Sequence, residues 1–339
     1  MGIIRFYLAI SVVCWHMLGK VVAPLIAGET AVLLFFMISG FYMAMILNEK
    51  YTSNFKFYAS RVLRLYPIYF LIFAATCALV LHSKPTTNFE AAMYSDLPVW
   101  HKSLLLISNI SIFGLDFLPF LGIGHAMINV LPPAWSLGVE IGFYAVAPFL
   151  VRRSIKTLTV VVVATLLIRA SFWQEQVTWR YFFAPAVWCF FILGSLSYRL
   201  WHLASDDIKK RIGIAALLGL PILGYFCALQ VPKDFDNPLF WLFYLCFAAA
   251  LPPIFRVTKF SKADALIGDL SYPIYLVHLP FLTIFNQGTI LKNIIFIVAI
   301  SIVLLLMVFP IEILRKKLGS RSRHLAPAQS SGIVAPSVA

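Results

Sequence analysis

Residues 2–18 read GIIRFYLAISVVCWHML, an apolar run that contains one arginine, Arg5, and one histidine, His16. The two lie eleven positions apart (16 − 5 = 11), which at about 100° per residue is about three helical turns, so both point from one face, about 16 Å apart along the axis. Inserting a charged side chain and an imidazole into a membrane helix is costly, and such residues mark functional paths by default. This stripe is therefore the first candidate for a functional site.

The composition is that of a membrane protein with several spans. Of the 339 residues, 61% are hydrophobic and 12% are charged, against about 25% charged in soluble domains, and the mean hydropathy is +0.89. The net charge of +13 comes from Lys and Arg residues in short loops between apolar runs, which is typical of the positive-inside rule. The sequence therefore favours the bilayer as a partner and argues against nucleic acid. The five cysteines are scattered without a Cys-x-x-Cys pair, so we expect no metal site.

Runs of about twenty apolar residues predict an all-α, polytopic transmembrane helix bundle. Its ten expected spans lie near 3–22, 30–48, 64–83, 135–151, 157–172, 181–201, 212–230, 238–255, 265–285 and 290–313. Residues 1–314 then form one transmembrane domain. Residues 315–339 form a basic tail with a Pro/Ala/Ser-rich end, which we expect to be disordered. The oligomeric state cannot be read from these patterns.

The distribution of basic loops predicts that both termini are cytoplasmic and that segment 104–123 does not cross the membrane. Span 64–83 leaves the cytoplasm and span 135–151 returns to it, so a single crossing between them would break the parity. Segment 104–123 is therefore expected to be re-entrant or interfacial. The loops assigned to the cytoplasm carry Lys50, Lys56, Arg61, Arg64, Arg152, Arg153, Lys156, Arg199, Lys209, Lys210, Arg211, Arg256, Lys259 and Lys262.

The sequence Arg-Val-Leu-Arg-Leu-Tyr-Pro, residues 61–67, lies at the expected cytoplasmic entry to the third span. Arg61 and Arg64 are three positions apart, so both guanidinium groups lie on one helix face. Such a pair suits a multiply charged phosphate ligand. The alternative is that these arginines anchor the helix end at the lipid headgroups.

Trp135-Ser136-Leu-Gly-Val-Glu140 opens a span from the outer side of the membrane. Ser136 and Glu140 share a face, and Glu140 is expected about 8 Å below the outer end of its helix. A buried carboxyl group has a raised pKa or a cationic partner, and either suits acid or base chemistry. The alternative is a structural hydrogen bond between helices.

Two histidines are expected at a similar depth, in the outer half of the membrane. His16 lies about 20 Å from the cytoplasmic end of its helix, and Ser-Tyr-Pro-Ile-Tyr-Leu-Val-His, residues 271–278, places Tyr275 and His278 on one face. Either histidine has the alternative of an interhelical hydrogen bond. The step Ser39-Gly40, midway through the second span, permits close approach of a helix or ligand and by itself indicates packing.

Together these placements form a pattern: arginines near the cytoplasm, and His16 and Glu140 towards the outside. A phosphate-bearing molecule that docks from inside would reach outward to an imidazole, which removes a proton from an acceptor hydroxyl. A secondary transporter or flippase of a glycan precursor is an alternative, but we find no inverted repeat to support it. A non-catalytic membrane scaffold is a second alternative.

Five motifs in this order resemble the acyltransferase-3 family of integral membrane acyltransferases, found mostly in bacteria. The resemblance covers nearly all of the spans. Each motif is weak alone, and the order of the five is the signal. They are Arg5-x10-His16, Phe36-Met-Ile-Ser39-Gly40, Arg61-x-x-Arg64-x-Tyr66-Pro67, Trp135-Ser136-Leu-x-x-Glu140-x-x-Phe143-Tyr144 and Ser271-Tyr272-x-x-Tyr275-Leu-x-His278.

The resemblance implies transfer of an acyl group, usually acetyl from acetyl-CoA, to a hydroxyl of a surface or secreted glycan such as O-antigen or exopolysaccharide. It implies that His16 is the catalytic histidine and that Arg5, Arg61 and Arg64 bind the phosphates of coenzyme A, while Glu140 orients His16 or the sugar. Ser39, Gly40, Trp135, Ser136, Tyr275 and His278 would support the substrates or the structure. The acceptor would be a glycan or lipid-linked glycan, and the location the bacterial inner membrane. One departure is Gly-Val-Glu-Ile-Gly around Glu140, where many members have a second acidic or amide residue.

Overall fold

The computed structural model describes residues 1–19, 21, 23–83, 88–123, 128–172, 177–200, 205–230, 235–285 and 288–323. Within these ranges the chain is helical and contains no β-strand, so the predicted all-α class is confirmed. The α-helices are α1 (Gly2–Leu18), α2 (Gly28–Glu49), α3 (Asn54–Ser83), α4 (Asn88–Tyr94), α5 (Val99–Ser111), α6 (Trp135–Leu150), α7 (Ile155–Ser171), α8 (Val177–Phe182), α9 (Ala184–Leu200), α10 (Asp206–Gln230), α11 (Pro238–Thr258), α12 (Lys262–Phe285) and α13 (Ile290–Arg323).

Each of the ten predicted spans coincides with one helix of at least 16 residues. Six helices are long and apolar enough to cross a membrane, namely α2, α3, α10, α11, α12 and α13. The other four, α1, α6, α7 and α9, have 16 or 17 residues, about 25 Å, somewhat less than the ~30 Å of a bilayer core. The chain is thus a multi-pass membrane protein, and the total of ten crossings stays a prediction.

The two largest differences between expected and observed helix boundaries, each about ten residues, are at the start of α3 and the end of α13. The third span begins at Asn54 rather than near residue 64, so Arg61 and Arg64 lie inside α3 and not at its entry. The helix continues upstream because residues 54–60 contain no proline or glycine to stop it. The last helix, α13, runs to Arg323 through the first residues of the predicted tail, and residues 324–339 lie outside the described part.

Segment 104–123 is not one continuous helix. α5 has 13 residues, about 20 Å, and it ends where Ile112 adopts a left-handed conformation with φ 65°. Turns and a short 3-10 helix, Leu118–Leu121, follow. The depth of the segment in the bilayer stays a prediction.

The helices that carry the motifs cross at contacts where only glycine fits. A Cβ atom on Gly40 in α2 would lie 1.8 Å from the Phe191 carbonyl oxygen of α9, and one on Gly194 would lie 1.9 Å from the Met37 carbonyl oxygen. At the crossing of α1 with α12, a Cβ on Gly2 would lie 1.6 Å from a backbone oxygen of α12. These approaches fix α2 against α9 and α1 against α12 through backbone contact, as in other membrane helix pairs.

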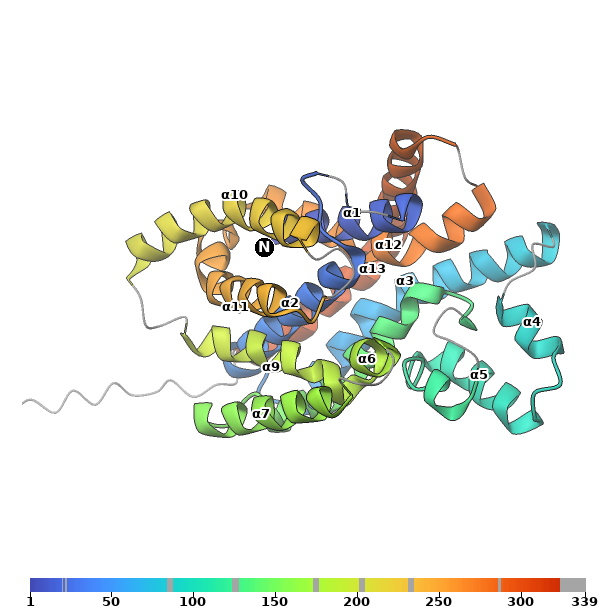
Figure 1. The fold of residues 1–339 in the computed structure, drawn as a ribbon, viewed down its shortest axis with the longest axis horizontal. Helices are drawn as coiled ribbons and strands as arrows, with labels where there is room; N and C mark the ends of the chain where they lie inside the picture. The colour runs from blue at the N-terminus through green and yellow to red at the C-terminus, as the bar shows by residue number, and fades with distance from the viewer. Residues whose placement is uncertain are drawn as a thin grey trace, which may run out of the picture.

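Figure 1 shows how the bundle is divided. α10 and α11 pack together on one side, and α7 packs along α9. α4 and α5 lie at the opposite edge, beyond α3 and α6 (Figure 1). The motif-bearing helices α1, α2, α3, α6 and α12 meet between these parts, and the cavities described next lie where they meet.

Candidate active site

Three arginines line one pocket of about 90 Å³ between α1, α2, α3, α6 and α12, which we call the arginine pocket. The predicted grouping of Arg5 with Arg61 and Arg64 is therefore what the structure shows. The same pocket collects side chains from all five motifs. Its polar lining consists of Arg5, Ser39, Tyr42, Arg61, Arg64, Ser136, Glu140, Tyr144, Ser271, Tyr272 and Tyr275.

The arginine side chains of this pocket have few partners. Arg61 is 6% exposed. One of its terminal nitrogens donates to Ser60 Oγ at 3.3 Å, and its Nε has no partner. In the described part of the chain, none of the ion pairs involves Arg5, Arg61 or Arg64. Buried charges are normally paired, so the pocket is short of negative charge.

The carboxylate of Glu140 is held by hydroxyl groups instead of arginines. Its Oε1 accepts a hydrogen bond from Ser39 Oγ at 2.6 Å and a second one from Tyr144. The ring of Tyr144 faces the guanidinium of Arg61 at 5.9 Å. Asp269 and, less strongly, Glu140 act electrostatically on Arg5 and Arg64 from beyond ion-pair distance. The carboxylate is therefore fixed in place but leaves the arginine donors free.

Glu140 and His16, both expected towards the outer side of the membrane, line different cavities. Trp135, the first residue of α6, lines a second cavity, which is described below. Five residues further along, about 8 Å, Glu140 has reached the arginine pocket. The hydrogen bonds found for its carboxylate go to Ser39 and Tyr144, so its contacts do not support a role in orienting His16.

Two larger cavities adjoin the arginine pocket. One has a volume of about 390 Å³, the other about 280 Å³, and Arg5 and Arg64 line both. The first extends between α3, α12 and α13 to Arg315 and Lys316, and the second reaches Lys259. Asp269 lines both cavities, with Glu312 in the first and Asp264 in the second, so basic side chains outnumber acidic ones in each.

His16 and His278 line a separate cavity of about 470 Å³, which we call the histidine cavity. Seven of its nineteen lining residues are Trp, Tyr or Phe, and Glu29 is the acidic residue among them. The lining residues are Val12, Trp15, His16, Gly19, Ala27, Gly28, Glu29, Thr30, Val32, Pro132, Pro133, Trp135, Tyr181, Phe182, Phe235, Phe240, Tyr275, His278 and Leu279. A roomy, aromatic cavity with a few polar groups is typical of a small-molecule site.

The two histidines are neighbours, although their helices are far apart in the sequence. Their ring centroids lie 5.2 Å apart with the planes tilted by 39°. His278 is fully buried, and its Nδ1 lies 2.6 Å from the Tyr275 carbonyl oxygen. His16 is more open. The prediction of similar depth for the two histidines agrees with this contact.

The arginine pocket and the histidine cavity share two lining residues, Val32 and Tyr275. The Tyr275 hydroxyl lies 2.8 Å from Ser136 Oγ and 3.3 Å from the Pro133 carbonyl oxygen. Ser136 therefore acts here by holding Tyr275 in the wall between the two spaces. Arg5 and His16 lie on one face of α1 but on opposite sides of that wall. This face of α1 therefore contributes Arg5 to the arginine pocket and His16 to the histidine cavity.

The remaining predicted residues divide between lining and packing. Ser39 lines the arginine pocket, whereas Gly40 faces α9 and makes the close crossing described above. Trp135 lines the histidine cavity beside Tyr181, with ring centroids 4.9 Å apart. In the Ser39-Gly40 step, the serine therefore faces a pocket and the glycine allows close helix packing.

Sequence reasoning missed Glu29, in the first turn of α2. Glu29 lines the histidine cavity together with Trp15. It was missed because the expected span began at residue 30, which placed Glu29 outside the membrane helix. The signal was nevertheless there: an acidic residue in the first turn of a helix that continues into an apolar run.

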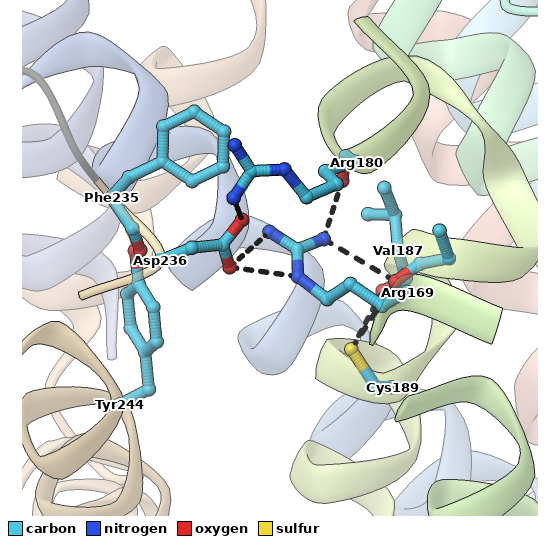
Figure 2. A network of polar contacts seen from close by, with 8 residues as sticks. Arg169, Arg180, Val187, Cys189, Phe235, Asp236 and Tyr244 are labelled. Atoms are coloured by element: carbon cyan, nitrogen blue, oxygen red, sulfur yellow. Dashed lines mark hydrogen bonds and ion pairs between the residues drawn. The ribbon is translucent and has the colours of Figure 1, made fainter. Parts of the chain in front are cut away.

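A buried ionic network, also missed, supports one wall of the histidine cavity (Figure 2). Arg169 of α7 donates through Nε and Nη2 to Asp236 Oδ1 at 2.8 and 2.7 Å, and Arg180 of α8 donates to Oδ2 at 2.8 Å. Tyr181 and Phe235, each adjacent in sequence to a member of this network, line the cavity with ring centroids 5.3 Å apart. The network therefore fixes two aromatic rings of the wall.

A comparison with protein families gives one match. A family model described as an acyltransferase domain, that of the acyltransferase-3 family, matches residues 1–313. Neither a curated protein nor a solved structure matches the chain. The matched range contains every residue of the arginine pocket and of the histidine cavity.

Proposed function

Because the chain belongs to the acyltransferase-3 family and is an integral membrane acyltransferase, we propose that it transfers an acetyl group from acetyl-CoA to a hydroxyl of an outward-facing glycan. The observation that carries this proposal is the set of three arginines without ion pairs around one pocket, joined through a shared wall to a cavity that contains His16.

The donor is assigned to the arginine side. Coenzyme A carries several phosphate charges, and guanidinium groups bind phosphate through two parallel hydrogen bonds. Arg5 and Arg64 adjoin the two larger basic cavities, which offer the volume that a nucleotide needs. The phosphates would satisfy the donors that the protein leaves open, and the thioester would point towards Tyr275.

The acceptor is assigned to the histidine cavity. A sugar presents apolar C–H faces to aromatic rings and hydroxyls to polar groups, and this cavity offers both. The acceptor class is a glycan or a lipid-linked glycan of the O-antigen or exopolysaccharide kind. In this arrangement the arginine pocket faces the cytoplasm of a bacterial inner membrane, and the histidine cavity faces outward.

His16 is assigned as the general base of a direct transfer. Its imidazole takes the proton from the acceptor hydroxyl while the hydroxyl oxygen forms a bond to the acyl carbonyl carbon. The carbon–sulfur bond of the thioester breaks, the thiolate of coenzyme A leaves, and the proton on His16 neutralises it. The products are an ester and the free thiol of coenzyme A, so His16 returns to its neutral form.

The test is glycan mass spectrometry on cells that express wild type, His16→Ala or no protein. General-base catalysis contributes about 10²- to 10⁴-fold, so we expect the acetyl mass increment to fall to the level of cells without the gene. His82→Ala is the matched control, because His82 is exposed at the end of α3, away from both cavities. Unchanged acetylation by His16→Ala at wild-type protein level would contradict the assignment of His16.

A further inference from the structure

The two ring nitrogens of His278 have unequal surroundings. Nδ1 lies 2.6 Å from the Tyr275 carbonyl oxygen, and a carbonyl oxygen only accepts, so Nδ1 carries the proton. Nε2 of the neutral ring is then an acceptor with a free lone pair. This atom is fully buried, and no described residue donates a hydrogen bond to it. An unsatisfied buried polar atom in a native fold calls for a functional explanation.

The neighbouring ring that fits this lone pair is that of His16. The centroids of the His16 and His278 rings lie 5.2 Å apart. In its neutral form the imidazole of His16 presents one N–H and one lone pair. The Tyr275 hydroxyl, another donor nearby, is already paired with Ser136 and Pro133. Catalytic hydrogen bonds are often long before the substrates bind and shorten in the complex, so the separation of the rings suits a contact that closes during catalysis.

We propose that His278 is a positioning residue for His16, accepting the N–H of His16 through its free Nε2. The inference rests on the proposed role of His16 as the base. With one His16 nitrogen fixed as a donor to His278, the other must present its lone pair, and this is the nitrogen that faces the acceptor hydroxyl. When His16 takes the proton of that hydroxyl, the Nε2 lone pair of His278 stabilises the imidazolium.

A second histidine suits this task in a membrane helix. In soluble enzymes a carboxylate commonly fixes the tautomer of the catalytic histidine. An isolated carboxylate is far more costly to bury than a neutral imidazole. Glu140 of α6 is bound to Ser39 and Tyr144. Glu29 lines the same cavity as the two histidines, but none of the ion pairs of the described residues joins it to either of them. The backbone carbonyl of Tyr275 replaces the charge by fixing the tautomer of His278, which in turn fixes that of His16.

The scaffold of the pair is rigid. α1 and α12, which carry the two histidines, touch backbone to backbone at Gly2 and Gly268. Asp264 of α12 accepts the N–H groups of Gly2 and Ile3 at 2.6 and 2.8 Å, so it caps the first turn of α1. Rigid elements hold catalytic groups within the narrow tolerance that proton transfer needs.

The first test compares His278→Gln with His278→Leu in purified protein. The assay uses radiolabelled acetyl-CoA and glycan extracted from cells that lack the gene. Gln keeps an oxygen that accepts from His16, whereas Leu has a similar size and no polar atom. We expect Leu to lower kcat about 100-fold with KM for acetyl-CoA unchanged, and Gln to stay within about 10-fold of wild type. A wild-type kcat for Leu, or equal losses for Gln and Leu in folded protein, would overturn the proposal.

The second test is a double-mutant cycle with His16→Ala. If His278 acts only through His16, adding His278→Leu to His16→Ala lowers the residual rate no further. A further loss of about 100-fold would show that His278 acts independently and would overturn the inference. If His16→Ala alone keeps the wild-type rate, the proposed function of His16 has failed. If His16→Ala is inactive and His278→Leu is fully active, only the positioning role has failed.

Discussion

The molecule contains two clusters of arginines, and they differ in what neutralises them. Arg169 and Arg180 share one carboxylate, Asp236, with every contact at 2.7 or 2.8 Å. Arg5, Arg61 and Arg64 line a pocket whose carboxylate, Glu140, is bound by hydroxyls. Both arginines of the first cluster are ion-paired with Asp236, whereas none of the ion pairs of the described residues involves Arg5, Arg61 or Arg64.

Whether a buried arginine is ion-paired distinguishes structural from functional arginines better than its burial does. A buried charge pair that is broken destabilises a fold strongly, so a completed cluster is expected to act on stability. A cluster left short of negative charge weakens the fold and is best explained by a ligand that completes it. The predictions below test this division, and they run from the largest expected effect to the smallest.

Asp236→Ala is expected to destabilise the protein most, by about 3–5 kcal/mol, because it leaves two buried guanidinium groups unpaired. Thermal unfolding in detergent measures the change. The control is Asp206→Ala, whose carboxylate is 62% exposed in its pair with Arg256, where exposed pairs contribute about 0–1 kcal/mol. Equal changes for the two variants would show that the Asp236 network is not a structural clamp.

Arg169→Gln and Arg61→Gln are expected to act in opposite ways on stability. The first breaks a buried pair and should lower the free energy of unfolding by about 3 kcal/mol. The second removes an uncompensated charge, so the change should stay below about 1 kcal/mol or be stabilising. Chemical denaturation of both variants without ligand decides the matter, and a large loss for Arg61→Gln would show that this arginine is structural.

Coenzyme A is expected to stabilise the wild-type protein. A ligand that binds only the folded state adds about 2.7 kcal/mol at 100 times its Kd, which raises Tm. Arg61→Gln and Arg64→Gln should show little of this shift, while Arg153→Gln, an exposed arginine outside the arginine pocket, should show all of it. The same shift in Tm for all four proteins would contradict the proposal that coenzyme A binds at Arg61 and Arg64.

Ser39→Ala is expected to lower the free energy of unfolding less than Asp236→Ala or Arg169→Gln does. The substitution removes one hydrogen bond to the Glu140 carboxylate. A hydrogen bond to a charged group contributes about 1.5–3 kcal/mol. Because Tyr144 still donates to this carboxylate, we expect a loss at the lower end of that range. Ser11→Ala is the control, since Ser11 donates to a carbonyl oxygen of its own helix. A loss no greater than that of Ser11→Ala would mean that Ser39 does not hold the carboxylate.

The sequence was sufficient for features that depend on one helix at a time. Hydropathy located the helical spans, and the spacing of Arg5 and His16 placed both on one face of α1, past the wall formed by Tyr275. The grouping of Arg61 and Arg64 followed from their i, i+3 spacing in the same way.

Features that depend on pairs of helices could not be read in this way. Helical periodicity states which face a residue lies on but not which helix it meets, so the contact of His16 with His278 and the pairing of Arg169 with Asp236 appear only in three dimensions. Depth along a helix likewise does not say which cavity a side chain lines: Glu140 lines the arginine pocket, whereas His16 lines the histidine cavity.

The central claim is that the arginine pocket lacks an anion and that coenzyme A supplies it. The most direct test is equilibrium binding of radiolabelled coenzyme A to purified wild type and to Arg64→Gln, both checked for folding. Losing one charge-assisted phosphate contact is expected to weaken binding about 10-fold or more. Equal affinity of the two proteins for coenzyme A would contradict the account.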